Sequence, residues 1–143
     1  MRMQIINATE EHIAFLTDAE ARIFSDAWSE GALASHMRSA TSRTLVAADD
    51  EGHPVGYLLG SVIFPEGEVY RVASLPEARR AGVASALLDA FLCELPVCFL
   101  EVRESNAAAR ALYEKHSFSL VGERKNYYKA PIENACIYKR EVE

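Results

Sequence analysis

The sequence predicts an α/β fold, a mixed β-sheet with helices on both faces, and three observations support this prediction. The 143-residue chain is 50% hydrophobic and 25% charged, as is usual for a globular domain. Segments of helical and strand periodicity follow one another in the order β-α-α-β-β-β-α-β-α-β-β. The apolar run 97–102, interrupted only by Glu101, is typical of a central strand covered on both faces. We expect one domain over residues 1–143.

The first half of the chain predicts a strand, two helices and three further strands. Residues 3–8 are short and apolar enough for the first strand. Apolar side chains then recur at helical spacing over 13–27, and Thr9 is placed to cap that helix. Ser29 is a second candidate N-cap. Three strands separated by turns follow, over residues 44–48, 55–64 and 68–74.

The second half predicts two helices between three strands. An amphipathic run over 83–95 is stopped by Pro96, and the buried strand comes directly after it. An alanine-rich segment over 106–115 predicts the last helix. Two strands, 118–126 and 134–140, complete the sheet.

Composition excludes several function classes. The formal net charge of −6 argues against a nucleic-acid-binding surface and mildly favours a cationic partner. The chain contains no long apolar stretch, so we expect neither secretion nor membrane insertion, and a cytoplasmic location. Cys93, Cys98 and Cys136 are too scattered for a disulfide framework or a zinc site, and the first two are expected to be reduced core residues. The four histidines share no spacing, and we interpret them as surface or structural residues; no metal is implied.

The turn over residues 79–84 is a candidate anion site. It reads Arg79-Arg-Ala-Gly82-Val-Ala84 and opens the helix predicted over 83–95. The unpaired backbone N–H groups at a helix start and the helix dipole both attract anions. Gly82 lets the backbone approach a ligand closely because it has no Cβ, and Arg79 and Arg80 add positive charge.

The turn and the order of elements together resemble the GNAT family of N-acetyltransferases over essentially the whole chain. The turn matches that family's pyrophosphate signature, Arg/Gln-x-x-Gly-x-Gly/Ala. Within the family, the chain looks most like the RimI-type ribosomal-protein-alanine acetyltransferases. The segments that carry this resemblance are Trp28-Ser-Glu30, Leu100-Glu-Val-Arg103, Ser105-Asn-Ala-Ala-Ala109, Leu112-Tyr-Glu114 and Arg124-Lys-Asn-Tyr-Tyr128.

The resemblance implies acetyl-CoA as cosubstrate, without a metal, and a protein N-terminus as acceptor. On resemblance alone, that acceptor is the N-terminal alanine of ribosomal protein S18. The residues implied to hold acetyl-CoA are Val72 and Ser74 through their backbone, Arg79, Arg80, Gly82, Val83, Ala84, Asn106 and Tyr113. Those implied to form the acceptor site are Trp28, Tyr127 and Tyr128.

Two residues are the candidates for proton transfer. Glu101 is a partly desolvated carboxylate in an apolar strand, which suits a general base for an attacking amine. Tyr113 lies seven residues after Asn106, on the same helix face. A tyrosine has a reference pKa of about 10, so its hydroxyl is a donor at neutral pH and a suitable acid for a leaving thiolate.

Structural interpretations of the same residues remain open. Glu101 can pair with Arg103, Tyr113 and Trp28 can be core residues, Asn106 can be a plain first-turn helix residue, and Tyr127 and Tyr128 can be strand-end residues. The chain also departs from the family pattern at four places, which are Ala84, Ser74, Ala27 and the segment His116-Ser-Phe118. The last lacks a C-cap glycine, so we expect a less stable helix end beside Tyr113.

Two other functions remain open. One is a GNAT enzyme that acetylates a lysine side chain or a small polyamine-like amine. The other is a CoA-binding regulatory module without activity. The presence of both Glu101 and Tyr113 argues against the second, because a module without catalysis needs neither.

Overall fold

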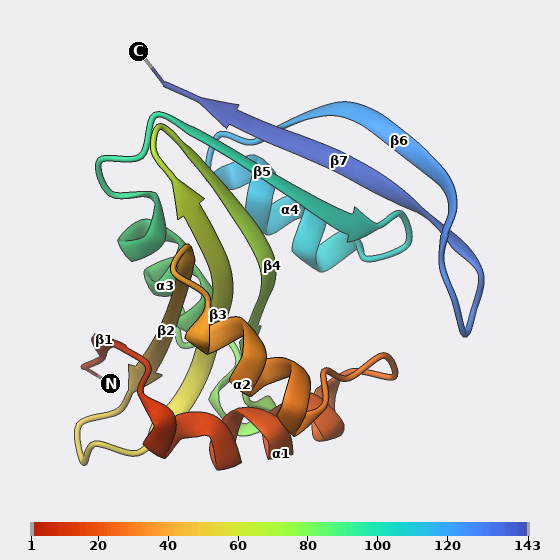
Figure 1. The fold of residues 1–143 in the computed structure, drawn as a ribbon. Helices are drawn as coiled ribbons and strands as arrows, with labels where there is room; N and C mark the ends of the chain where they lie inside the picture. The colour runs from red at the N-terminus through yellow and green to blue at the C-terminus, as the bar shows by residue number, and fades with distance from the viewer. Residues whose placement is uncertain (1, 143) are drawn as a thin grey trace.

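The computed structural model describes residues 2–142 as a seven-stranded mixed sheet in the order β1-β2-β3-β4-β5-β7-β6 (Figure 1). The strands are β1 Gln4–Asn7, β2 Ser42–Ala48, β3 Pro54–Ile63, β4 Glu66–Ser74, β5 Val97–Arg103, β6 Ser119–Tyr128 and β7 Glu133–Glu141. The helices are α1 Ile13–Ile23, α2 Glu30–Arg38, α3 Val83–Leu92 and α4 Ala107–Lys115, with short 3₁₀ turns η1 Glu10–His12 and η2 Pro76–Ala78. The predicted order of elements is confirmed.

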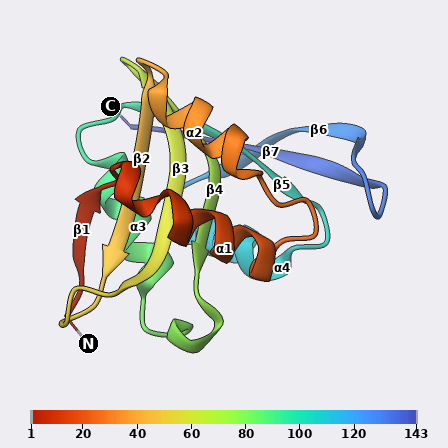
Figure 2. The ribbon, with the colours of Figure 1, turned by 60° about the horizontal axis from the view of Figure 1, so that its bottom comes forward.

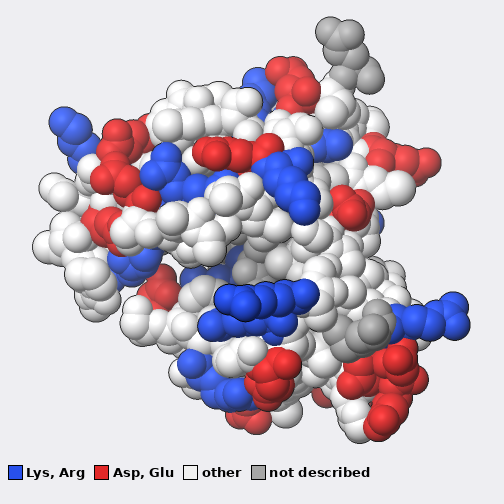
Figure 3. Space-filling model, turned by 180° about the vertical axis from the view of Figure 1, so that it is seen from behind, with Lys and Arg blue, Asp and Glu red and all other residues white. Residues whose placement is uncertain are grey.

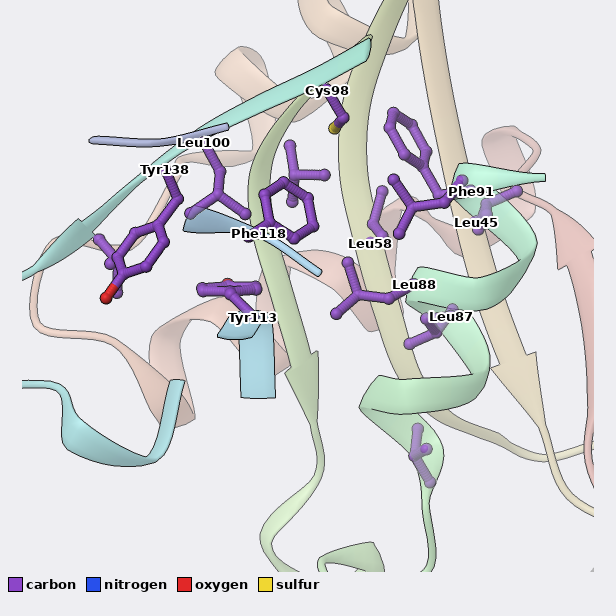
Figure 4. Close-up of a cluster of buried hydrophobic side chains, with 14 of the residues drawn as sticks. Leu45, Leu58, Leu87, Leu88, Phe91, Cys98, Leu100, Tyr113, Phe118 and Tyr138 are labelled. Carbon is purple, nitrogen blue, oxygen red and sulfur yellow. The ribbon is translucent and has the colours of Figure 1, made fainter. Parts of the chain in front are cut away.

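The helices cover both faces of the sheet and enclose two separate cores. Helices α1 and α2 lie on one face (Figure 2), over a cluster that contains Leu16, Leu33, Val46, Tyr57 and Leu59. Helices α3 and α4 lie on the other face, over a larger cluster that contains the labelled side chains of Figure 4, among them Leu58, Phe91, Leu100, Tyr113 and Phe118. Alternation along each strand divides its side chains between these cores. The sheet therefore separates two compartments of the protein.

The sheet splits between β4 and β5. These strands pair in parallel only from Glu66 opposite Val97 to Val69 opposite Leu100. At the next residue, Tyr70, the register of β4 against β3 shifts, as in a β-bulge. Beyond that point β4 stays with β3 and β5 stays with β7, so the two halves of the sheet diverge (Figure 1).

Several predicted boundaries and burials are wrong in detail. Helix α1 ends at Ile23, four residues before Ala27, because Phe24 adopts an extended conformation. Helix α3 ends at Leu92, and Cys93 is exposed, whereas Cys98 is buried as expected. A cysteine in an apolar run is core only if its helical phase faces the sheet, and the end of α3 turns Cys93 outward.

The end of α4 compensates for its missing glycine in two ways. Ser117 takes the left-handed conformation, with φ of 72°, that a C-cap glycine adopts without strain. The His116 ring lies between two residues of α3, with Nε2 3.1 Å from the Ser85 hydroxyl and Nδ1 3.2 Å from the Asp89 carboxylate. Phe118 packs edge-on against Tyr113, with ring centroids 5.8 Å apart. The support of Tyr113 thus comes from contacts between α3, α4 and the start of β6.

Candidate active site

The gap between β4 and β5 exposes backbone groups that would otherwise pair within a sheet. Leu75 N–H donates to the Val55 carbonyl at 2.8 Å, and hydrogen-bonded and non-bonded pairs alternate along an antiparallel ladder. The N–H and C=O groups of Val72 and Ser74 therefore point away from β3, towards the side that β5 has left. An extended, amide-rich ligand can pair with such an edge as an added strand.

The turn before α3 leads directly from this edge to a helix N-terminus. Gly82 caps the helix with φ of 78°, and a Cβ at this position would have nothing within 4 Å. Ala86 N–H donates to the Gly82 carbonyl, so the N–H groups of Val83, Ala84 and Ser85 precede the intrahelical ladder. Arg79 and Arg80 are exposed. This arrangement fits an anion held by backbone donors with positive charge beside it.

The surface on the α3/α4 side is hollowed. Seen from behind, Lys and Arg side chains border a hollow between two lobes (Figure 3). A negatively charged chain such as a nucleotide diphosphate can lie along a border of this kind.

Tyr113 reaches the gap from the α3/α4 side. It is 6% exposed and belongs to the larger core. Within residues 2–142 its hydroxyl has no hydrogen-bond partner, in contrast to that of Tyr138, which donates to Glu114 and accepts from Arg110. Burial raises the pKa of Tyr113, so the hydroxyl stays protonated at any physiological pH. The positive charge of Arg71, on β4, acts on Tyr113 in the opposite direction, as a smaller contribution.

Glu101 approaches the gap from the opposite side of the sheet. Its neighbours Leu100 and Val102 face the α3/α4 core, so alternation turns Glu101 towards the α1/α2 side. Its Oε1 accepts from Arg124 Nε at 3.1 Å, and its side chain is 23% exposed. Its Oε2 is buried and has no partner among the described residues. A buried acceptor without a partner is unfavourable, which makes this oxygen a candidate for contact with a substrate.

Arg103 does not pair with Glu101, so that structural alternative is wrong. Arg103 donates to the carbonyls of Lys129 and Pro131, at 2.9 and 3.0 Å, and pairs with Glu133 at 3.3 Å. Its guanidinium lies 4.5 Å from the centre of the Tyr128 ring. Arg103 therefore fastens the β6–β7 turn beside the end of β5.

The tyrosine pair lies at the end of β6, next to Glu101. Tyr127 is half exposed, and its ring meets that of Tyr128 edge-on at 5.1 Å. The negative charge of Glu101 raises the pKa of Tyr127, and burial together with that charge raises the pKa of Tyr128 to about 12. Both are strand-end residues, and both also face the candidate base.

Two further acidic residues, Asp26 and Glu68, also affect the pKa values of this tyrosine pair. Asp26 raises the pKa of Tyr128 and Glu68 that of Tyr127, each as a smaller contribution than Glu101. In Figures 1 and 2 the loop between α1 and α2, which carries Asp26, projects from the same side of the molecule as the β6–β7 turn, which follows Tyr128.

Trp28 lies in that loop and is half-buried. Its ring packs against His36 and Tyr70, with centroids 5.5 and 6.1 Å away. Its backbone N–H donates to Glu20 Oε1 at 2.9 Å. Glu20 is fully buried and was missed by sequence reasoning, although its place in the apolar stripe of the first helix, directly after Ala19, was a signal.

Asn106 caps α4 instead of standing in its first turn. Its side-chain oxygen accepts from Ala109 N–H at 3.1 Å, as an N-cap does. The residue is exposed, so its amide group remains available to a ligand. Seven positions before Tyr113, it lies at the start of the same helix.

The structure also has a cavity away from the gap. This cavity of about 660 Å³ lies between the C-terminal ends of α3 and α4 and the end of β7, and none of the candidate donor, acceptor or proton-transfer residues lines it. Over residues 2–142 no cluster of three or more His, Cys, Asp or Glu side chains is placed to hold a metal ion. Within the same residues no helix is both long and apolar enough to cross a membrane.

Comparison with known proteins gives consistent results. Residues 13–118 match the model of the acetyltransferase (GNAT) family. The [ribosomal protein bS18]-alanine N-acetyltransferase of Salmonella typhimurium is 30% identical over 131 residues, which cover 88% of this chain and 86% of that protein. The enzyme of the same name from Escherichia coli K12 is 32% identical over 114 residues, 76% of each chain.

The fold matches those of solved enzymes along nearly its whole length. The crystal structure of the ribosomal-protein-S18-alanine N-acetyltransferase from Escherichia coli superposes with a TM-score of 0.91 at 27% identity, covering 99% of this chain and 94% of that one.

Proposed function

The chain belongs to the acetyltransferase (GNAT) family, and from this premise we propose that it transfers the acetyl group of acetyl-CoA to the N-terminal α-amine of a protein. It is an N-acetyltransferase. The acceptor we propose is the N-terminal alanine of ribosomal protein bS18, since relatives at 30–32% identity carry that name.

The observation that carries this proposal is the position of Glu101 and Tyr113 on opposite sides of one gap. Acetyl-CoA supplies the thioester. The backbone of Val72 and Ser74 holds its pantetheine arm along the free edge of β4, with Asn106 as a further contact. Arg79, Arg80, Gly82, Val83 and Ala84 hold its pyrophosphate at the start of α3.

The two side chains move protons at the reacting atoms. Glu101 Oε2, buried and without a partner among the described residues, takes a proton from the attacking amine through one water. An α-amine has a pKa near 8, so about a tenth is already neutral at pH 7 and one carboxylate is sufficient. A backbone N–H near Ser74 polarises the carbonyl, and the Tyr113 hydroxyl donates its proton to the leaving thiolate.

Direct attack needs no enzyme nucleophile, and the cysteines are poorly suited to be one. Burial raises the pKa of the Cys98 thiol to about 12, and burial also raises that of Cys136. Cys93 is exposed at the end of α3, away from the gap. Mass spectrometry of the enzyme during turnover should therefore find no acetylated cysteine.

Acceptor choice is tested with three amines. We expect an Ala-starting basic peptide to be acetylated faster than its Nα-blocked form carrying a lysine, and faster than spermidine. The tyrosine pair beside Glu101 suits a small first side chain. If the blocked peptide or spermidine reacts faster, the acceptor is a lysine or a polyamine and the assignment to a protein N-terminus is wrong.

Donor binding is tested at Gly82. Gly82→Asp places a negative charge at the proposed pyrophosphate site, so acetyl-CoA affinity measured by calorimetry should fall strongly. Gly52→Asp is a matched control, because Gly52 also has a positive φ, 84°, and a Cβ added there would meet nothing within 4 Å. Equal affinities of the two variants would remove the donor site from this turn.

The acid is tested at Tyr113. Tyr113→Phe should lower kcat by about 10²–10⁴-fold, the usual contribution of a general acid, with acetyl-CoA affinity nearly unchanged. A kcat close to that of the wild type would show that the hydroxyl is not the acid.

A further inference from the structure

The loop between α1 and α2, residues 24–29, carries Trp28 and Asp26, and only part of it packs against the core. Ser25, Asp26 and Ala27 are exposed, and Phe24 and Trp28 are half-buried. Backbone hydrogen bonds close the helix ends on either side of it, from Phe24 N–H to the Glu20 carbonyl and from Leu33 N–H to the Ser29 carbonyl. Phe24 and Trp28 therefore hold the loop partly by packing against the smaller core, Trp28 on His36 and Tyr70. The exposed residues between them depend on polar contacts.

Three residues of the loop, Phe24, Asp26 and Trp28, also contact one ion pair. Trp28 N–H donates to Glu20 Oε1 at 2.9 Å. Arg71 Nη2 donates to the Asp26 carbonyl at 3.0 Å and to its carboxylate at 3.3 Å. The Arg71 guanidinium also lies 3.7 Å from the centre of the Phe24 ring.

The ion pair itself is buried, and both Glu20 oxygens accept hydrogen bonds. Arg71 Nε and Nη2 donate to the two oxygens of Glu20 at 3.1 and 3.0 Å, and the Tyr57 hydroxyl donates to Oε2 at 2.6 Å. Glu20 is 0% exposed and the Arg71 side chain 14%. A bidentate pair with these extra bonds has a single geometry, so it can hold a loop in register.

Arg71 also belongs to the strand that faces the donor. It follows the Tyr70 bulge and directly precedes Val72, whose backbone faces the gap. Its side chain shares the α1/α2 face with Tyr57 and Glu101, on the acceptor side of the sheet. Strand β4 thus presents its backbone to the acetyl donor, and through Arg71 it holds the loop beside the acceptor site.

We propose that the Glu20–Arg71 pair positions the acceptor site by fastening loop 24–29 to strand β4, so that Trp28 and Asp26 form the wall opposite Tyr127 and Tyr128. This role rests on the proposed function. Arg71 is a positioning residue: it acts through the loop and does not contact the reacting atoms. Breaking the pair should weaken acceptor binding and leave the donor site intact.

The loop can be observed without any substrate, because Trp28 is the only tryptophan. In Arg71→Gln we expect the Trp28 fluorescence to shift to longer wavelength and acrylamide quenching to increase. The KM for an Ala-starting peptide should rise about tenfold or more, as small misplacements near a reacting centre do. The Kd of acetyl-CoA should change less than about twofold, because the proposed donor contacts lie outside the loop. The peptide KM of Arg71→Lys, which keeps the charge, should lie between that of Arg71→Gln and that of the wild type.

Two controls separate positioning from general stability. Arg22→Gln breaks an ion pair on the same helix, Arg22–Glu77 at 3.0 Å, which is exposed and does not contact the loop. Tyr57→Phe removes one bond from Glu20 but none of the three loop contacts. Both should leave KM and fluorescence unchanged. If Arg71→Gln fails to fold, Arg71→Lys carries the test, with a smaller shift in both readouts.

The outcomes distinguish the two proposals. Unchanged fluorescence and KM in a folded Arg71→Gln variant, or in Arg71→Lys if Arg71→Gln does not fold, would overturn the positioning role. If the wild type does not acetylate the Ala-starting peptide, the proposed acceptor is wrong, while the fluorescence of Trp28 still decides whether the pair holds the loop.

Discussion

The two walls of the gap between β4 and β5 are held by arginines whose exposure rises from Arg71 through Arg103 to Arg124. On the β4 side, Arg71 and Glu20 form a buried pair that solvent screens very little. On the β5 side, Arg103 binds the β6–β7 turn with 20% of its side chain exposed, and Arg124 binds Glu101 with 56% exposed. Similar contacts therefore serve two purposes: a buried pair supports the fold, whereas an exposed one orients groups at little cost in stability.

The largest effect is expected at Glu20. Glu20→Ala leaves Arg71 without its partner in a buried position, and such a change costs about 3–5 kcal/mol of unfolding free energy. Urea unfolding followed by circular dichroism measures it. Arg22→Gln, which breaks the exposed pair on the same helix, should stay close to the wild type. Equal losses in the two variants would contradict the contrast between buried and exposed pairs.

Arg103 should show an intermediate effect. Arg103→Gln removes two hydrogen bonds from a charged donor to the turn carbonyls, and the expected loss is about 1–3 kcal/mol. Because Arg103 also lies over the Tyr128 ring, the peptide KM should rise. Unfolding curves and peptide kinetics check both. If Arg103→Gln lost as much unfolding free energy as Glu20→Ala, the two arginine contacts would contribute equally to stability and the contrast between the two walls would be wrong.

A smaller, pH-dependent effect is expected at His36, which packs against Trp28. Burial lowers the pKa of His36 from its usual 6.5, so the folded state favours the neutral ring. Its contribution to stability is complete above pH 6.5 and is lost as the pH falls from there through the folded pKa. The wild type should lose more stability between about pH 7.5 and 5 than His36→Gln. In the comparison variant His53→Gln, only exposed ion pairs with Asp49 and Glu51, both at 3.8 Å, are lost, so its stability should differ from that of the wild type by no more than about 1 kcal/mol. If stability fell with pH in the same way in all three proteins, His36 would not be the source of the pH dependence.

The smallest effect on stability is expected at Arg124. Its pair with Glu101 is largely exposed, so Arg124→Gln should change the unfolding free energy by no more than about 1 kcal/mol. The variant releases Glu101 Oε1, so the change should appear in kcat/KM for the peptide. Stability loss matching that of Arg103→Gln, with unchanged kinetics, would show that this pair supports the hairpin and does not orient the base.

Much of the fold could be predicted from local patterns. The order of elements, the Ser29 cap and the existence of the strand around Glu101 are set by residues within one or two turns of each other. The expected cover on both faces of that strand is only partial, because Cys98, Leu100 and Val102 are buried on one face and the residues between them are half-buried. The positive φ of Gly82 and the start of α3 follow from the turn itself. Boundaries were less predictable: α1 stops at Ile23 although the apolar spacing continues to Ala27, because the Asp26 carbonyl and the Trp28 N–H bond to the Glu20–Arg71 pair and not within a helix.

The candidate site divides in the same way. Residue types and their order along the sequence determined the turn at 79–84, the N-terminal position of Asn106, and the candidates Glu101 and Tyr113. Only the tertiary structure decided that Glu101 pairs with Arg124 and not with Arg103, that Cys93 is exposed, and that Glu20 binds Arg71, 51 residues away. The reason is physical: local backbone preference and periodicity act over about three or four residues. The partner of a buried charge depends on which strands and helices the sheet brings together.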